Sequence, residues 1–247
     1  MQTRVPDLTL GCSYRCLPGL FNFLSNSAAF LVTATTNCVA AALGSAASAE
    51  GSTADARADG RARASLLLGH ALCLAAVLGG ATALALLLIP DTVLSLYGAP
   101  HGTPLAAAAR AYLLVRAVAV PSMFLMFAAV GASLGAGDAI TPTVGVLAAA
   151  VVNLVGDVAL VMWAGAGLLG AAAATAAASW TGTALVLARL RQLVPPRFAM
   201  PRAADVAPLL AVSGALLTTQ ITNSLVYSYT TKARLLKLAC AKAAQPL

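Results

Sequence analysis

Long apolar runs with almost no charged residues limit the folds that this chain can adopt. A helix needs about 20 predominantly apolar residues to cross the hydrocarbon core of a bilayer. Six runs reach roughly that length, and their apolar residues are continuous rather than alternating, which argues against a membrane β-barrel. The sequence predicts an all-α, polytopic membrane protein with about six transmembrane helices, at 19–47, 64–90, 111–136, 140–164, 167–190 and 204–229.

The composition agrees with this interpretation and excludes other classes. Charged residues make up 9% of the chain and hydrophobic residues 60%, whereas a soluble domain carries about 25% charged residues. The formal net charge of +7 comes from Lys and Arg that lie mostly beside or between the apolar runs, where they set membrane topology. We therefore expect a lipid bilayer as the surroundings and no nucleic-acid partner. Cys12 and Cys16 lack the second Cys or His pair that a zinc site needs, so no metal site is expected.

Arginines concentrate in two of the loops between the predicted helices. Arg57, Arg61 and Arg63 precede the second run, and the loop after the fifth run holds Arg197 and Arg202. Cytoplasmic loops carry an excess of Lys and Arg, so both loops are placed in the cytoplasm.

Three local features predict helix geometry. Pro121 lies inside the third run and should kink that helix, because proline removes a backbone hydrogen bond. Gly131 and Gly135 have the spacing that lets two helix backbones approach closely, although chance gives the same spacing in so Gly-rich and Ala-rich a run. Thr141 precedes Pro142 and is the expected N-cap of the fourth helix.

Asp157 is the acidic residue that sits inside an apolar run; the other acids lie in termini, loops or span ends. An ionisable residue there costs about 2.5–3.5 kcal/mol on insertion scales, which makes a functional site the default hypothesis. Asn153 precedes it by four residues, so both side chains lie on one face of a helix. The pair can hold a proton or offer oxygen ligands to a cation such as Na⁺. The alternative is a polar clasp between helices.

Other polar residues in the runs are weaker candidates. Thr175 lies mid-helix, where a threonine commonly bonds to its own backbone. Arg116 either reaches the interface with its charged end or binds an anionic substrate. Polar residues of the first and sixth runs face either a wet cavity or other helices, and the candidates are Asn37, Gln220 and Asn223. Neither a nucleophile–base pair nor a phosphate-binding loop is visible, so an enzyme is not expected.

Three stretches of the chain resemble the multidrug and toxic compound extrusion (MATE) transporters. They are Leu20 to Ser25, Tyr112 to Pro121, and Ala132 to Pro142 continuing to Asn153 and Asp157. The likeness is greatest to the plant DETOXIFICATION branch, including its plastid-envelope members. It implies a twelve-helix fold in two six-helix lobes, and the export of small organic solutes in exchange for H⁺ or Na⁺ with no other cofactor.

The resemblance also implies an organisation of the chain and a cation site. The six predicted helices correspond to the second to seventh helices of the family. The segments are an N-terminal segment at 1–18, an incomplete N-lobe bundle of five spans at 19–192, a cytoplasmic inter-lobe linker at 193–203, the first C-lobe helix at 204–229 and a basic tail at 230–247. In the family's N-lobe cation site, an Asn and an Asp four apart act with a Thr on the next helix. Asn153, Asp157 and Thr175 occupy the matching places.

Departures from the family pattern leave alternatives open. The first helix and almost all of the second lobe have no counterpart, so we expect a partial chain, or one that associates with itself. The basic tail is either an amphipathic surface helix or the product of an altered reading frame. A truncated non-transporting membrane protein, a partner-binding half-transporter and a lipid flippase are the other candidate functions. The resemblance favours the chloroplast envelope, with the vacuolar or plasma membrane as alternatives.

Overall fold

The computed structural model describes residues 20–47, 54–96 and 104–197, together with positions 218, 219, 222, 226 and 229. Residues 20–28 are helical and continue, through a turn at Ala29, into α2. The elements that follow are all helical: α2 (Phe30–Ala47), α3 (Ala54–Leu88), α4 (Pro90–Leu96), α5 (Pro104–Ala117), α6 (Val120–Gly135), α7 (Ile140–Asp157), the π-helix η1 (Val158–Trp163) and α8 (Gly167–Leu193).

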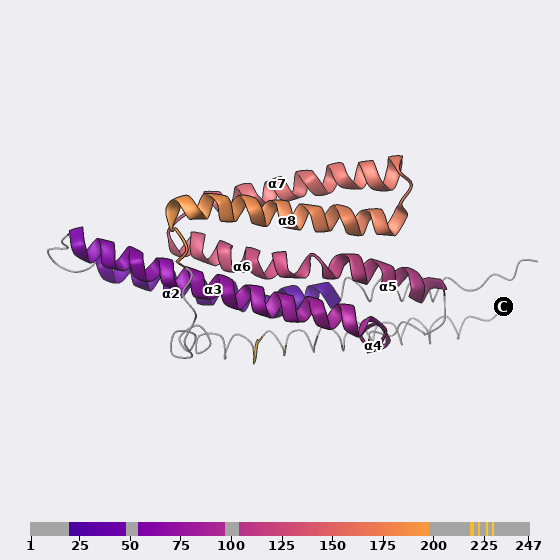
Figure 1. Ribbon diagram of the computed structural model, residues 1–247, viewed down its shortest axis with the longest axis horizontal. Helices are drawn as coiled ribbons and strands as arrows, with labels where there is room; N and C mark the ends of the chain where they lie inside the picture. Colours follow the sequence, from indigo (N-terminus) through magenta and orange to yellow (C-terminus); the bar gives the residue numbers. More distant parts are fainter. Residues whose placement is uncertain are drawn as a thin grey trace, which may run out of the picture.

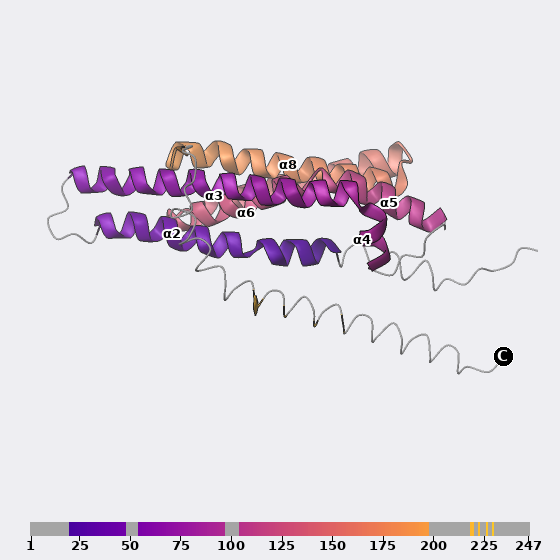
Figure 2. The ribbon, with the colours of Figure 1, turned by 60° about the horizontal axis from the view of Figure 1, so that its bottom comes forward.

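The long helices run side by side along the longest axis of the bundle (Figure 1). α6 packs against α2, α3 and α8, and α7 packs mainly against α8. Figure 2 shows the short α4 turning across the direction of the other helices at the end of α3. The buried core comes from α2, α3, α5, α6 and α8, with Leu31, Leu68, Leu113, Val120 and Leu190 among its most enclosed side chains.

Four helices are long and apolar enough to cross a membrane: Leu20–Ser45, Ala54–Leu88, Ile140–Trp163 and Gly167–Leu193. The bent pair Ala106–Ala117 and Val120–Gly135 makes a fifth if it counts as one span. These spans confirm the all-α membrane fold and match the first five predicted runs. The sixth run, 204–229, lies almost entirely outside the described residues, as do the segments 1–18 and 230–247.

The second predicted helix is longer than its apolar run. It begins at Ala54, ten residues before the expected start at 64, and ends at Leu88. The added turns hold Asp55, Arg57, Asp59, Arg61 and Arg63. Hydropathy does not detect such a segment, but Ala and Arg are good helix formers, so the helix continues past the apolar region.

The predicted kink near Pro121 is confirmed. The two halves are bent by 42°, and the break falls at Val118 and Ala119. Pro121 then lies in the first turn of α6, where its missing N–H is tolerated. Side chains of α8 supply donors at this break: Trp180 Nε1 donates to the Val118 carbonyl at 3.2 Å, and Thr183 Oγ1 donates to the Ser122 carbonyl at 3.0 Å.

The close approach expected at Gly131 and Gly135 is also confirmed, and the partner is α2. A Cβ on Gly131 would lie 2.5 Å from the carbonyl oxygen of Val32, and one on Gly135 would lie 2.7 Å from that of Thr36. The Thr36 hydroxyl donates to the Gly131 carbonyl at 3.0 Å. Only glycine fits at these two positions without moving a backbone.

The expected N-cap at Thr141 is wrong. α7 begins at Ile140, and the carboxylate of Asp138 accepts hydrogen bonds from the backbone N–H of Ile140 at 2.9 Å and of Thr141 at 3.1 Å. The Thr141 hydroxyl also donates to this carboxylate. A carboxylate is favourable here because the helix N-terminus carries unpaired N–H groups and a partial positive charge.

Candidate functional site

α7 and α8 pack closely because small residues line their contact. A Cβ on Gly182 of α8 would lie 3.0 Å from the carbonyl oxygen of Gly145. Farther along, a Cβ on Gly156 of α7 would lie 2.8 Å from the Cβ of Ala174. The other face of α7 is largely exposed, with large apolar side chains at Val146, Leu147, Val151, Leu154 and Val155. α7 is therefore an outer helix of the bundle whose inner face lies on α8.

Asn153 and Asp157 lie one turn apart on α7, as the sequence predicts, and both are half-buried. The amide Nδ2 of Asn153 donates a hydrogen bond to Oδ2 of Asp157 at 3.2 Å. Oδ1 of each residue is buried and has no hydrogen-bond partner among the described residues. A buried acceptor without a donor is costly, so each such atom in a native fold calls for an explanation.

The backbone changes its hydrogen-bonding pattern directly after this pair. α7 ends at Asp157, and the π-helix η1 begins at Val158. Ala164 N–H closes the segment on the carbonyl of Ala159 at 3.0 Å, a bond across five residues. π-helical turns inside α-helices are rare and frequently mark functional positions. No residue pattern in this run of the sequence predicts the π-helix.

Thr175 lies on α8 next to Ala174, the residue that meets Gly156 of α7. Thr175 and Asp157 each follow a residue of this contact, so they lie at the same level of the helix pair. No hydrogen bond joins them: the Thr175 hydroxyl donates to the carbonyl of Ala171 at 2.8 Å. Its oxygen keeps free acceptor lone pairs.

Arg116 lies in the last turn of α5, just before the break. Its guanidinium carbon lies 4.5 Å from the centre of the Phe21 ring, a geometry of favourable cation–π contact. The Phe21 ring in turn meets that of Tyr112 edge-on, with 6.4 Å between centroids. Nε of Arg116 is buried without a partner. Sequence spacing could not reveal Phe21 as a partner, because the two residues come from helices far apart in the chain.

The other predicted cavity residues are not gathered around Arg116 in the described part of the chain. Asn37 is exposed on α2. It follows Phe21 by sixteen residues along nearly continuous helix, which places it about 24 Å farther along the axis. Gln220 and Asn223 lie outside the described residues.

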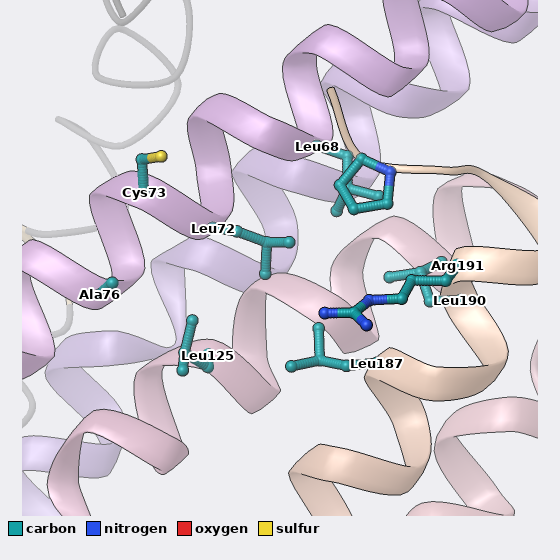
Figure 3. Close-up of a pocket in the computed structure, with 9 residues that line it drawn as sticks. Leu68, Leu72, Cys73, Ala76, Leu125, Leu187, Leu190 and Arg191 are labelled. Carbon is teal, nitrogen blue, oxygen red and sulfur yellow. The ribbon is translucent and has the colours of Figure 1, made fainter. Parts of the chain in front are cut away.

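One further feature was not expected from the sequence. A cavity of about 180 Å³ lies between α3, α6 and α8, and the guanidinium of Arg191 reaches into it (Figure 3). From the sequence alone, Arg191 is one of the arginines beside the apolar runs that set membrane topology. No sequence pattern indicates that it lies near residues of α3.

Comparisons with known proteins agree on one family. The MatE family model matches residues 20–159. Protein DETOXIFICATION 44, chloroplastic, of Arabidopsis thaliana is 35% identical over 135 residues, which are 53% of this chain and 26% of that protein. Protein DETOXIFICATION 43 of the same plant is 30% identical over 131 residues, which are 52% of this chain and 25% of that protein.

Solved structures show the same fold. A MATE protein in the bent conformation superposes with a TM-score of 0.74 at 18% identity, over 90% of this chain and 47% of that one. An inward-facing multidrug resistance MATE family transporter gives a TM-score of 0.72 at 19% identity, over 88% and 47%. The match thus spans about half the length of these structures and about a quarter of the two plant proteins. Because the family model covers more than half of the chain, and the fold agrees with it, the chain belongs to the MatE family of membrane transporters.

Proposed function

We propose that this chain carries the N-lobe cation site of a secondary antiporter, which exports small organic solutes in exchange for H⁺ or Na⁺. Asp157 binds the coupling cation, and Asn153 and Thr175 supply neutral oxygen ligands.

The buried, unpartnered Oδ1 atoms of Asn153 and Asp157 carry this proposal. Both are acceptors on one helix face, next to a hydrogen-bonded amide–carboxylate pair. A proton on Asp157 removes its charge and supplies a donor, and a hard cation such as Na⁺ accepts lone pairs from several oxygens. Either event supplies partners for the two Oδ1 atoms.

The position of the pair suggests how binding affects the helices. Asp157 lies where α7 changes to the π-helix η1, and next to the close contact of Gly156 with Ala174. A change of charge here alters the packing of α7 on α8, and a cation that binds one arrangement better shifts the population toward it.

The surroundings of Arg116 support a role for this residue in solute binding. Its Nε is buried without a partner, and its guanidinium lies on an aromatic ring rather than beside a carboxylate. A buried guanidinium of this kind attracts anions, so we infer that anionic groups on the solute bind there. Asn37 is too far along α2 to share this solute site, and Gln220 and Asn223, which lie outside the described residues, stay candidates for the cavity lining.

Two further parts of the proposal concern the membrane and the other half of the transporter. The chloroplastic relative favours the chloroplast envelope as the location.

Alternating access in secondary transporters generally uses two repeats that move around a central site. Since the solved transporters are about twice as long as the matched region, we propose that transport needs a second six-helix half, covalently joined or from a second copy.

The test is solute transport in proteoliposomes that contain the protein, with an imposed pH or Na⁺ gradient. The expected result is gradient-driven transport of a fluorescent organic solute, which the Asp157→Asn variant abolishes. Coupled transport that persists in Asp157→Asn would show that the cation binds elsewhere.

A second variant distinguishes the two ions. Thr175→Val removes an oxygen that Na⁺ would use but that a proton on Asp157 does not need. If Na⁺ is the coupling ion, Thr175→Val lowers the apparent Na⁺ affinity, and Thr175→Ser restores it. If both Thr175 variants transport as the wild type does with either gradient, Thr175 is not a ligand.

A further inference from the structure

The cavity between α3, α6 and α8 lies apart from the proposed cation site and has an apolar wall. Leu68 and Leu72 of α3, Leu125 of α6 and Leu187 of α8 face one another across it (Figure 3). Cys73 and Ala76 continue this wall along α3, and Ala76 is exposed. The cavity is therefore a groove that opens along α3 toward the surroundings of the bundle.

Arg191 gives this apolar groove a positive charge. Its side chain leaves α8 and directs the guanidinium between Leu72 and Leu187 (Figure 3). Within the part of the chain that the structure describes, no carboxylate lies within ion-pair distance of Arg191. Arg191 is itself exposed, so its guanidinium lies at the open side of the groove and can pair with an anion that approaches from outside.

The end of the bundle around the groove is basic. The backbone N–H of Arg197 donates to the Ser65 carbonyl at 3.1 Å, which brings the segment after α8 onto α3 and places Pro196 at the groove. Arginines near this end are Arg57, Arg61, Arg63, Arg189, Arg191 and Arg197, against the acids Asp55, Asp59 and Asp138. Asp138 already caps α7. The net positive charge favours an anionic ligand.

The depth of the groove in a membrane follows from α3. Its charged turns end at Arg63, and no charged residue occurs from Ala64 to Leu88. At 1.5 Å per residue, Leu68 lies about 6 Å and Ala76 about 18 Å beyond Ala64. The hydrocarbon core is about 30 Å thick, so the groove lies mainly in the leaflet on the arginine-rich side and ends near the middle of the bilayer. A lipid whose phosphate lies at the level of the arginines would extend its acyl chain into this range.

We propose that the groove between α3, α6 and α8 binds an anionic phospholipid, with an acyl chain along Leu68, Leu72 and Leu125 and the phosphate paired with Arg191. The apolar wall selects a lipid over a free phosphate, and the guanidinium selects an anionic over a zwitterionic headgroup. Basic pockets between transmembrane helices at the cytoplasmic side are suited to such headgroups.

Native mass spectrometry of the purified full chain tests the proposal, with equal amounts of dioleoylphosphatidylglycerol and dioleoylphosphatidylcholine in the detergent. We expect the phosphatidylglycerol adduct to exceed the phosphatidylcholine adduct by about fivefold, the factor that about 1 kcal/mol per arginine gives near a membrane surface. Arg191→Gln should reduce this ratio to near one. Soluble glycerol phosphate should not displace the lipid.

Two control variants keep the result specific. Arg189→Gln makes the same charge change two positions away, about 200° around α8, and should preserve the preference. Ala76→Phe fills the groove and should lower the occupancy of both lipids, while circular dichroism verifies that the helices remain folded. The proposal is overturned if the wild type shows no preference, if Arg191→Gln keeps it, if Arg189→Gln loses it equally, or if Ala76→Phe binds as the wild type does.

Discussion

The amide of Asn153 donates to Oδ2 of Asp157 at 3.2 Å, while Oδ1 of both residues remains buried and unpartnered. One hydrogen bond therefore holds the pair together without using its remaining acceptors. A purely structural clasp between helices would direct these oxygens to donors on α8. The nearby Thr175 hydroxyl instead donates to Ala171 on its own helix.

The first prediction concerns the neutral partner of this pair. Asn153→Leu removes one oxygen ligand and the donor to Asp157, and should raise the cation concentration for half-maximal transport about tenfold or more, since a hydrogen bond to a charged group contributes about 1.5–3 kcal/mol. Thr143→Val, which removes an exposed hydroxyl near the start of the same helix, should leave that concentration unchanged. Equal effects of the two variants would contradict a ligand role for Asn153.

The contact of Gly156 with Ala174 leads to a second prediction. Gly156→Ala places a Cβ 2.8 Å from the Cβ of Ala174 and 3.2 Å from its Cα, which belongs to the backbone. Overpacking of this kind costs about 1–3 kcal/mol. Thermal unfolding in detergent should show the loss of stability.

A second substitution tests whether that loss comes from this contact alone. Ala174→Gly in the Gly156→Ala background removes the clashing Cβ and should recover most of the lost stability. Gly80→Ala is the matched control, because no atom lies within 4 Å of its added Cβ, and alanine is the better helix former. If Gly80→Ala destabilises the protein as much as Gly156→Ala, the helix contact is not the cause.

The third prediction concerns pH and the cap of α7. The hydrogen bonds from the Thr141 hydroxyl and backbone lower the pKa of Asp138, with smaller contributions from the Ile140 N–H and Arg189. A carboxyl whose pKa is lower in the folded state stabilises the fold above its unfolded pKa, which is about 4, and this contribution is lost as the pH falls through the folded pKa.

Asp138→Ala should therefore lower the free energy of unfolding by about 0.5–2 kcal/mol near neutral pH, the usual value of an N-cap. The difference between variant and wild type should shrink as the pH falls below about 4. Asp138→Asn keeps a capping oxygen and should lose the pH dependence rather than the cap. Denaturant unfolding at a series of pH values measures the free energy of unfolding of both variants and of the wild type. A difference between Asp138→Ala and the wild type that is constant with pH would contradict this account.

The apolar runs and their lengths predicted most of the fold, because a membrane-spanning helix consists of about 20 consecutive, mostly apolar residues. The runs at 19–47, 140–164 and 167–190 agree with the helical spans within a few residues. Helix ends outside the apolar region were missed, as in the first turns of α3, because a charged helical turn and a charged loop have the same composition.

The site was predictable where its residues are close in the chain and not where they come together through packing. Asn153 and Asp157 share a face because they are four apart on one helix. The contact of Arg116 with Phe21 depends on how separate helices pack, and so does the cavity that Arg191 shares with the leucines of α3. The π-helix after Asp157 forms because backbone hydrogen bonds there span five residues instead of four. The pattern of side chains in the sequence does not indicate this change.

Protonation of the Asp157 carboxyl is the measurement that tests the central proposal most directly. Infrared difference spectroscopy of the protein in lipid, on a step in pH or in Na⁺ concentration, reports the carbonyl band of a protonated carboxyl without requiring transport. We predict a band that the pH or Na⁺ step changes, that is absent in Asp157→Asn, and that is retained in Asp138→Asn. A band of the same size in Asp157→Asn, or no change on either step in the wild type, would contradict the assignment of Asp157 as the cation-binding carboxyl.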